Sequence, residues 1–436
     1  MGRRTRCISL IVLSLVVMGA LASSASAAAS PLSEPLPAAS LSAAVPGTHA
    51  GLASLSFAPE RDVPFGPNLV AIAIGDFNGD GIADLAVAKS SAATVSIRLG
   101  KGNGTFGGPH GFAVPPNVAS VAVADLNHDG KLDLVTSVYY SRRDGRGTIS
   151  VLLGKGNGTF RARHDYRLGP LGIENRGPVA IGDLNGDHRL DVVAAAGLSI
   201  YVLLGRGDGT LVRGRAIPAD AHDPFAREGG VTVLVLADLN GDGRPDLVAG
   251  GQEGVNSPLG ITSVLLGKGT GSFKTAVTKQ RGAFLPQTLA LRDLNGDGKR
   301  DLIAEYFVDL EDDVGSGPNY QAIIVSLGEG NGGFAKRAEY DFDPQQVLSE
   351  FKVADFNSDG HRDLGLSINS GIDVLLGNGD GSFQPSVEVA TVQWPGGEMA
   401  AVGDFNRDGK MDIAAAHFND GTEIGRSLAI FLNRSN

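Results

Sequence analysis

Four side-chain oxygen groups recur in one pattern along this sequence. The first copy is DFNGDGIAD, which runs from Asp76 to Asp84 and has Asp at positions 1, 5 and 9 and Asn at position 3. Position 7 can add its backbone carbonyl. Hard oxygen ligands in this number suit Ca²⁺, which takes roughly six to eight, whereas Mg²⁺ keeps more of its water. Glycine at position 6 permits the sharp turn that would fold these groups around one ion.

The pattern occurs seven times, and the first aspartates are separated by 49, 58, 55, 55, 62 and 49 residues. We expect up to seven Ca²⁺ ions, one in each loop. The side-chain ligands predicted from positions 1, 3, 5 and 9 are Asp76, Asn78, Asp80, Asp84, Asp125, Asn127, Asp129, Asp133, Asp183, Asn185, Asp187, Asp191, Asp238, Asn240, Asp242, Asp246, Asp293, Asn295, Asp297, Asp301, Asp355, Asn357, Asp359, Asp363, Asp404, Asn406, Asp408 and Asp412. The backbone carbonyls predicted from position 7 are those of Ile82, Lys131, Arg189, Arg244, Lys299, His361 and Lys410.

Two alternatives to this calcium loop are an EF-hand and a metal-free turn. An EF-hand needs Glu at position 12 and flanking helices, but position 12 is apolar or Thr in every copy and strands flank each loop: Val87, Thr136, Ala194, Ala249, Ala304, Leu366 and Ala415. A metal-free turn rich in Asp and Asn would explain a single copy. Seven copies that keep all four side chains favour metal. The third copy has His188 in place of the glycine, so we expect a strained turn with an imidazole that points to solvent.

The acidity of the chain is consistent with bound cations. The formal net charge is −11, and the seven loops hold 21 of the 48 acidic residues. Loss of an N-terminal leader would remove three arginines, and seven Ca²⁺ ions would then balance the remaining charge. The acidity therefore does not require a basic partner. Lys and Arg are spread thinly, which argues against a nucleic-acid partner.

The loops must be positioned by short strands. Each unit has an apolar run, the acidic loop, a second apolar run, a variable loop, a third run, a glycine turn such as GKGNGTF, and a more polar fourth run. The runs are short, β-branched and bounded by Gly, Asn and Asp, which is typical of strands. A period near fifty residues indicates a propeller or solenoid. We predict an all-β, seven-bladed β-propeller with four-stranded antiparallel blades, the first strand lining the channel and the fourth at the rim. The phenylalanines of the glycine turns are expected to pack under the next blade: Phe106, Phe160, Phe273, Phe334 and Phe383.

The two ends of the repeat region complement each other. The seventh unit stops after its third strand, at Leu432, without a glycine turn or a fourth strand. The segment from Ser56 to Val63 resembles the segment from Ser382 to Val389, which leads into the fourth strand of the sixth unit. We therefore predict that an N-terminal strand completes the last blade and closes the ring, which would remove an exposed sheet edge.

The first fifty residues have the features of export and linkage. Residues 1–27 combine three early arginines, a short apolar run and the cleavage-type sequence that ends at Ala27, as in a secretory signal peptide. Residues 28–50 are rich in Ala, Pro and Ser and are predicted to be a flexible spacer without strands, and residues 51–436 the propeller. The only cysteine, Cys7, lies in the signal. No later run is long enough to span a membrane, so we expect a secreted, extracellular or cell-surface protein.

The unit VAVADLNHDGKLDLV…ISVLLGKGNGTF resembles the FG-GAP and VCBS repeats of integrin α-subunit propellers and of many secreted bacterial proteins. The resemblance covers the chain from Leu55 to about Leu432. It implies calcium in the hairpin loop between the first and second strands of each blade. It also implies that ligands often bind at the face opposite these loops. The family hosts adhesion modules, lectin-like binders and carbohydrate-active enzymes, so it does not fix an activity.

The variable loops at the opposite face supply the candidate ligand residues. Tyr139, Tyr140 and Arg142 lie in one long loop, and Trp394 lies in the last connection between blades. Exposed aromatic rings can stack on sugars or anchor protein partners. The alternative is that these rings only fill gaps between blades.

The sequence favours a monomeric binding or adhesion module for an extracellular carbohydrate or protein ligand. The alternatives are a polysaccharide-active lyase or hydrolase on the same scaffold and a structural cell-surface protein. No catalytic residue is nominated. The acidic run at Glu311 could form a carboxylate pair for sugar cleavage, but such a run is more often a solvated loop.

Overall fold

The computed structural model describes most of the repeat region. The described residues are 39–40, 55–59, 61–66, 69–89, 92–138, 146–170, 177–196, 199–218, 231–252, 260–274, 278–282, 284–308, 320–343, 346–369, 371–391, 400–419 and 423–435. The chain divides into two compact units, Met1–Pro37 and Ala38–Asn436, and every described residue belongs to the second. Among these residues there is no helix with the length and apolar character that a membrane crossing requires. The predicted signal peptide of residues 1–27 lies outside the described residues.

The described residues of the second unit form seven sheets, each with four antiparallel strands, which we number as blades 1 to 7 in chain order, and one of them has a short fifth strand. Blade 1 contains β3 (Leu69–Gly75), β4 (Asp84–Lys89), β5 (Thr94–Arg98) and β6 (His110–Ala113). Blade 2 contains β7 (Val118–Ala124), β8 (Asp133–Val138), β9 (Arg146–Leu152) and β10 (His164–Pro170). Blade 3 contains β11 (Val179–Gly182), β12 (Asp191–Ala196), β13 (Ser199–Gly205) and β14 (Leu211–Pro218).

The remaining four blades follow the same order. Blade 4 contains β15 (Val231–Ala237), β16 (Asp246–Gln252), β17 (Gly260–Leu265) and β18 (Thr278–Gly282). Blade 5 contains β19 (Phe284–Arg292), β20 (Asp301–Val308), β21 (Tyr320–Gly328) and β22 (Phe334–Asp341). Blade 6 contains β23 (Leu348–Ala354), β24 (Asp363–Ile368), β25 (Gly371–Leu375) and β26 (Val387–Thr391). Blade 7 contains β27 (Ala400–Gly403), β28 (Asp412–Asn419), β29 (Glu423–Phe431) and β2 (Arg61–Pro64).

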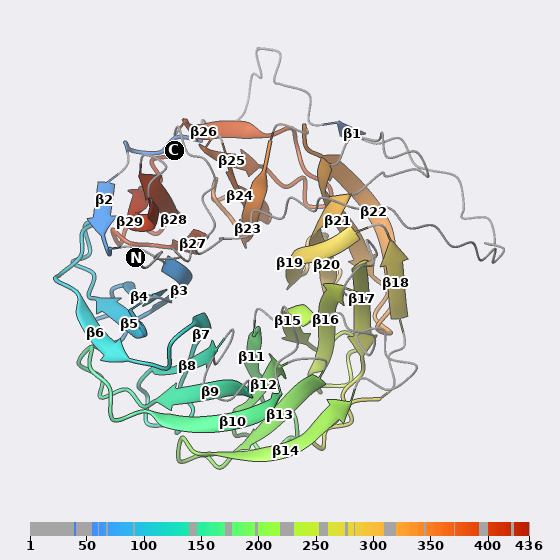
Figure 1. The fold of residues 1–436 in the computed structure, drawn as a ribbon. Coiled ribbons are helices and arrows are strands. Elements are labelled where there is room, and N and C mark those ends of the chain that lie inside the picture. Colours follow the sequence, from blue (N-terminus) through green and yellow to red (C-terminus); the bar gives the residue numbers. More distant parts are fainter. Residues whose placement is uncertain are drawn as a thin grey trace, which may run out of the picture. The chain divides into compact units, whose positions relative to one another are not determined.

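The first strands of the blades lie side by side around a closed ring. β3 contacts β7, and the contacts continue through β11, β15, β19 and β23 to β27, which contacts β3 again. Figure 1 shows this arrangement, with the first strands innermost and the fourth strands outermost. The second strand β4 is almost wholly buried, whereas β3 is partly open along its length and β6 is mostly exposed. The predicted all-β, seven-bladed propeller is therefore confirmed, with its first strands at the channel.

The hydrophobic core is divided among the junctions between blades. Seven clusters of buried side chains occur in the described residues, and each combines two neighbouring sheets. Leu134 of blade 2, for example, is fully buried in the same cluster as Ile97 of blade 1. Because a blade of one sheet cannot bury both faces alone, each blade depends on its two neighbours.

Blade 7 is built from both ends of the described chain. β2 pairs antiparallel with β29, with Arg61 opposite Ile430 and Pro64 opposite Ser427. Upstream of β2, Phe57 forms an isolated antiparallel bridge with Asn433. These pairings lie where the sequence predicts a closing strand. That this strand holds the ring together energetically stays a prediction, which substitutions at this junction can test.

Two details differ from the sequence predictions. The segment predicted as a spacer contains a two-residue strand, β1 (Ala39–Ser40), which pairs in parallel with Tyr340 and Asp341 of β22. The glycine-turn phenylalanines pack on the preceding blade and not on the next one. Phe160 of blade 2, for example, lies in an edge contact with Phe77 of blade 1 at a ring-centroid distance of 5.9 Å. The prediction was wrong because the strand pattern specifies that the ring is buried but not which neighbour buries it.

Candidate metal centre

Each acidic pattern forms the hairpin loop between the first and second strands of its blade. The first loop, from Asp76 to Ala83, connects β3 to β4. Two residues per loop have left-handed backbone angles. Position 6 has φ between 62° and 88° in all seven loops, and position 4 has φ between 56° and 79°. The need at position 4 was missed in the sequence, although four of the seven loops have glycine there. Two left-handed residues curl the loop back on itself, so the polar side chains gather on its inner side.

The aspartate at position 1 holds the curl through the backbone. Asp76 accepts N–H groups from Gly79 at 2.7 Å, Asp80 at 3.1 Å and Gly81 at 2.7 Å. The bond from position 6 recurs in every loop at 2.7–2.9 Å. A carboxylate that accepts several backbone N–H groups is a fixed anionic point inside the loop.

Positions 3, 5 and 7 continue the same hydrogen-bond ladder. The Asn side-chain oxygen at position 3 accepts the N–H of position 5 at 3.0–3.1 Å in all seven loops. The carboxylate at position 5 accepts the N–H of position 7 at 2.8–3.0 Å. In five loops the Asn amide also donates to the position-5 carboxylate, as Asn78 does to Asp80 at 2.8 Å. The side chains at positions 3 and 5 therefore converge.

The aspartate at position 9 begins the second strand and is fully buried in all seven blades. One of its oxygens accepts the N–H of position 2 at 2.7–3.0 Å. The other accepts, at 2.7–2.8 Å, the N–H of the residue that follows or ends the third strand. In blade 1 these donors are Phe77 and Gly100. From the sequence, position 9 received only a metal-binding role, and its bridge between the acidic loop and the glycine turn was missed.

The bridge made by the position-9 aspartate explains why the glycine turn begins with glycine, a requirement that the sequence alone does not reveal. A Cβ on the glycine that begins the turn would lie 2.1–2.3 Å from the carbonyl oxygen of position 8 in blades 1 to 6. At Gly100, for example, an added Cβ would lie 2.3 Å from the Ala83 carbonyl oxygen. Backbone atoms this close leave no room for a side chain, so glycine is required there. Both segments consequently lie on the same face of the propeller, as the sequence predicts.

Burial and crowding disfavour the charged form of the position-9 carboxylates. The pKa of Asp84 is raised to about 6, chiefly by burial and in smaller part by the negative charges of Asp80 and Asp76, against the lowering effect of its two N–H donors. The pKa values of Asp133, Asp363 and Asp412 are likewise raised to about 6 by burial. Burial also raises the pKa of Asp191, Asp246 and Asp301. Three carboxylates therefore act on one another in each loop, and a cation among them would relieve that repulsion.

The donor set of each loop fits a hard cation in its chemistry. Side chains at positions 1, 3, 5 and 9 contribute carboxylate and amide oxygens to each loop. That these oxygens hold an ion stays a prediction. The described residues contain no group of three or more His, Cys, Asp or Glu side chains that already stands in metal-ligand geometry. Their oxygens accept backbone N–H groups, which hold the loops in their curled form. In the third loop, His188 adopts φ 62° and its side chain is 97% exposed, as expected.

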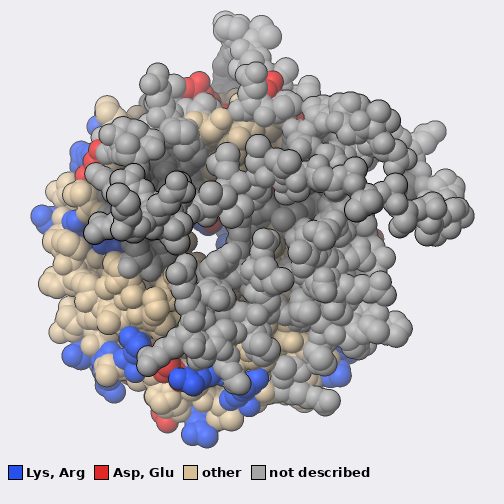
Figure 2. All heavy atoms as spheres, in the orientation of Figure 1, with Lys and Arg blue, Asp and Glu red and all other residues tan. Residues whose placement is uncertain are grey.

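The predicted ligand residues of the opposite face fall in two segments of the chain. Tyr139, Tyr140 and Arg142 lie in residues 139–145, and Trp394 lies in residues 392–399, all outside the described residues. The acidic run at Glu311 also lies outside them. Figure 2 shows that Lys and Arg side chains gather along the rim over β10 and β14, strands to which Arg167 and Arg213 belong.

A protein-family model described as an FG-GAP-like repeat matches residues 76–136, 138–194, 183–249, 238–304 and 355–415. These matches span about two thirds of the chain. No match was found among curated proteins.

The chain is similar to several solved structures. A lectin from Agrocybe aegerita, described as recognising non-reducing terminal N-acetylglucosamine, has 18% identity and a TM-score of 0.50, over 80% of this chain and 86% of that chain. A rhamnogalacturonan lyase from Bacillus licheniformis has 13% identity and a TM-score of 0.49, over 86% of this chain and 76% of that chain. A biofilm matrix protein of V. cholerae has 12% identity and a TM-score of 0.38, over 87% and 91% of the two chains. At these identities the likeness to the lectin supports the fold alone.

Proposed function

The chain belongs to the FG-GAP-like repeat family, and on that premise we propose that it is a secreted, calcium-binding β-propeller. Its role in this proposal is to bind an extracellular carbohydrate or protein ligand. The observation that carries the calcium part is the sevenfold repetition of one curled loop. Each copy contains three carboxylates and an amide, and in the first copy the carboxylates of Asp76 and Asp80 act electrostatically on Asp84.

The residues that would hold each ion are those at positions 1, 3, 5 and 9, with the carbonyl of position 7. In the first loop these are Asp76, Asn78, Asp80, Asp84 and Ile82. A bound Ca²⁺ would supply the positive charge that the crowded carboxylates lack. The loop's own N–H groups already orient Asp76 and fix Asp84 against the glycine turn.

Calcium removal tests this part. Binding of an ion only to the folded state stabilises that state by about 2.7 kcal/mol per site when the free ion is at about 100 times its Kd. We therefore expect the melting temperature of the full-length protein to fall by several degrees or more when EDTA replaces millimolar calcium. Isothermal titration calorimetry should report several equivalents of bound calcium.

Matched variants separate the loops from non-specific ion effects. In the described part of the chain, the exposed carboxylate of Asp80 at position 5 hydrogen-bonds only within its own loop, so Asp80→Asn should remove one equivalent without unfolding the chain. Asp62→Asn, which changes an acid of β2 outside the loops, is the control. A protein that stays metal-free at millimolar calcium, with a melting temperature indifferent to EDTA, would overturn the calcium proposal.

The binding role rests on the scaffold and on the place of its variable segments. The acidic loops and glycine turns occupy one face in nearly identical copies, so differences between blades concentrate in the connections at the opposite face. Variable loops on a rigid scaffold are a common place for recognition. The lectin of similar fold is described as recognising non-reducing terminal N-acetylglucosamine, which makes glycans with that end group sensible first probes.

A glycan array, probed with the full-length protein in calcium and in chelator, tests the binding role. Selective and saturable binding that weakens in chelator would support it. Release of shortened sugar products would replace the binding module with a polysaccharide-active enzyme. Absence of both, together with absence of a protein ligand in pull-down from extracellular material, would leave a structural cell-surface protein.

A further inference from the structure

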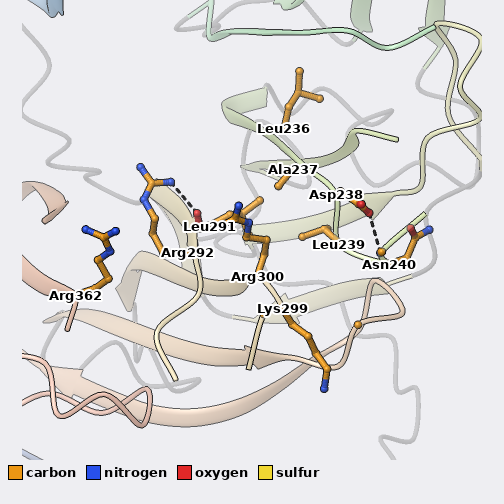
Figure 3. A pocket seen from close by; sticks show the side chains of 13 residues that line it. Leu236, Ala237, Asp238, Leu239, Asn240, Leu291, Arg292, Lys299, Arg300 and Arg362 are labelled. Carbon is orange, nitrogen blue, oxygen red and sulfur yellow. Dashed lines mark hydrogen bonds between the residues drawn. The ribbon is translucent and has the colours of Figure 1, made fainter. Parts of the chain in front are cut away.

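A cavity opens at the acidic-loop end of blades 4, 5 and 6. Its volume is about 770 Å³, and its wall includes Leu236, Asp238, Arg292, Lys299, Arg300 and Arg362. In Figure 3 the guanidinium groups of Arg292, Arg300 and Arg362 rise on the same side of the ribbon, whereas Lys299 points away from them. The cavity therefore brings together three arginines from two adjacent blades.

These arginines depart from the repeat at positions where other blades carry small or apolar residues. Arg292 ends the first strand of blade 5, and the other six first strands end in Gly or Ala. Arg300 and Arg362 occupy position 8 of the fifth and sixth acidic loops. Position 8 in the other five loops is Ala83, Leu132, Leu190, Pro245 or Met411. Since five blades fold without arginine there, the repeat architecture does not require these charges.

The three guanidinium groups belong to residues that line one cavity. Among the described residues no carboxylate forms an ion pair with any of the three, and Arg292 donates only to the neighbouring Leu291 carbonyl, at 2.8 Å. The nearest acids have other partners. Asp238 in the cavity wall accepts the N–H groups of Gly241 and Gly243 at 2.8 Å each, and Lys299 pairs with Asp297 at 3.5 Å.

Clustered like charges destabilise a fold unless a counter-charge arrives. Guanidinium groups present planar pairs of donors that match carboxylates and other oxyanions in bidentate geometry. All three arginine residues are exposed within the cavity, so a ligand can reach them. The cavity is far larger than a small inorganic anion needs, because one water molecule occupies only about 30 Å³ of liquid. Its volume falls instead in the range of sites for small organic ligands, roughly 300–1,000 Å³.

We propose that this arginine pocket binds an acidic oligosaccharide through the carboxylates of its sugar units. Arg292, Arg300 and Arg362 hold the carboxylates, and the polar Asn240 and the apolar Leu236 and Leu291 line the remaining wall. The inference rests on the proposed role as a binding module and names the ligand class for one site of that module. It places this site on the acidic-loop face, not on the opposite face that the sequence favours.

Calorimetric titration of the full-length, calcium-loaded protein with trigalacturonate tests the pocket. The matched ligand is its fully methyl-esterified form, which has the same sugars without the charges. The test variants are Arg300→Ala, Arg362→Ala and the variant with both substitutions. A further variant, Arg300→Lys, keeps the positive charge but lacks the planar pair of guanidinium donors. The control is Arg206→Ala, which removes an exposed arginine from a glycine turn outside the pocket. Unchanged melting temperatures verify that the variants are folded.

We expect trigalacturonate to bind the wild type and Arg206→Ala equally. Loss of one charged hydrogen-bond donor, as in Arg300→Ala, should weaken binding by about tenfold or more. The affinity of Arg300→Lys should lie between those of the wild type and Arg300→Ala. Added salt should weaken binding. Absence of trigalacturonate binding, equal binding by the double variant, or equal binding of the methyl ester would overturn the proposal. The proposal would also be overturned if inorganic sulfate bound as tightly as the trisaccharide, because the pocket would then recognise a free oxyanion without selecting the oligosaccharide. If other glycans still bind in those cases, the binding-module proposal survives and only the pocket assignment fails.

Discussion

The junction between blades 1 and 2 is formed by segments that follow one another in the sequence. The ring of Phe160, from the glycine turn of blade 2, packs edge-on against Phe77 of the first acidic loop at 5.9 Å. Gly158 of the same turn donates its N–H to the Phe77 carbonyl at 2.9 Å. A ring and a backbone donor from one turn thus dock beneath the neighbouring acidic loop.

The junction between blades 6 and 7 makes the same two contacts with atoms from opposite ends of the chain. Phe57, near the N-terminus, supplies the ring, at 6.4 Å from Phe356 of the sixth acidic loop. Asn433, near the C-terminus, supplies the donor, because its side-chain amide bonds to the Phe356 carbonyl at 2.7 Å. Blade 7 has no glycine turn, and a side-chain amide has taken the place of that turn's N–H.

Asn433 also replaces the glycine that begins the turn in other blades. Its own N–H donates to Asp412 at 2.8 Å, as Gly154 donates to Asp133 at 2.7 Å. Both junctions therefore have an aromatic ring and N–H donors at equivalent positions, although different parts of the chain provide these groups. Substitutions at matched positions of the two junctions can measure whether they are energetically alike.

The largest effect is expected at the buried aspartates of position 9. Asp133→Ala and Asp412→Ala each leave two buried N–H groups unpaired, at about 1–3 kcal/mol per group. Urea unfolding in EDTA should show losses of about 2–6 kcal/mol for both variants. The exposed Asp129→Ala, measured in parallel, should cost less than either. A much smaller loss for Asp412→Ala than for Asp133→Ala would show that the junction made by the chain ends contributes little to stability.

At the phenylalanines we expect a smaller maximum loss of stability, but a larger difference between the two junctions. Removal of a buried Phe ring costs about 3–5 kcal/mol, and Phe160 is only 6% exposed. Phe57 is less buried, so Phe57→Ala should cost less than Phe160→Ala in the same urea titration. If Phe57→Ala leaves stability unchanged while Phe160→Ala does not, the N-terminal segment does not hold the ring closed.

The smallest losses of stability are expected at Gly154 and Asn433, which occupy equivalent positions in blades 2 and 7. Gly154→Ala would place a Cβ 2.2 Å from the Leu132 carbonyl oxygen, and such overpacking costs about 1–3 kcal/mol. Asn433→Gly loses the amide bonds of the side chain, including that to Phe356, at about 0.5–1.5 kcal/mol for the net loss of a hydrogen bond. Thermal unfolding of the two variants side by side measures both. An Asn433→Gly protein as stable as the wild type would contradict the role assigned to the amide.

The fold was predictable because its signals are local and repeated. A single DLNGDG segment fixes a hairpin through glycine and Asx chemistry, and seven copies at a regular period specify the number of blades. The solvent-facing His188 was predictable for the same reason. The packing direction of Phe160 was not, since the pattern contains no information about which neighbour is closer. The metal-binding prediction for the loops is compatible with their donor set and awaits the calcium titration.

The arginine pocket had a readable but weak signal in the sequence. Arg300 and Arg362 both occupy position 8 of their loops, a departure visible once the copies are aligned. Arg292 lies outside the loop pattern and carries no such signal. The three become a cluster only because blades 5 and 6 are adjacent and their loops share one face.

The sequence by itself determined the strands, the acidic loops, the number of units and the complementary ends, because each depends on periodicity or on turn chemistry within a few residues. Tertiary structure decided which blade each phenylalanine packs against, how the position-9 aspartates bridge two turns, and which distant arginines share a cavity. Those relations join groups far apart along the chain, as the hydrogen bond from Asn433 to Phe356 does across 77 positions. No local rule specifies such pairings, since they arise only when the sheets close around one axis.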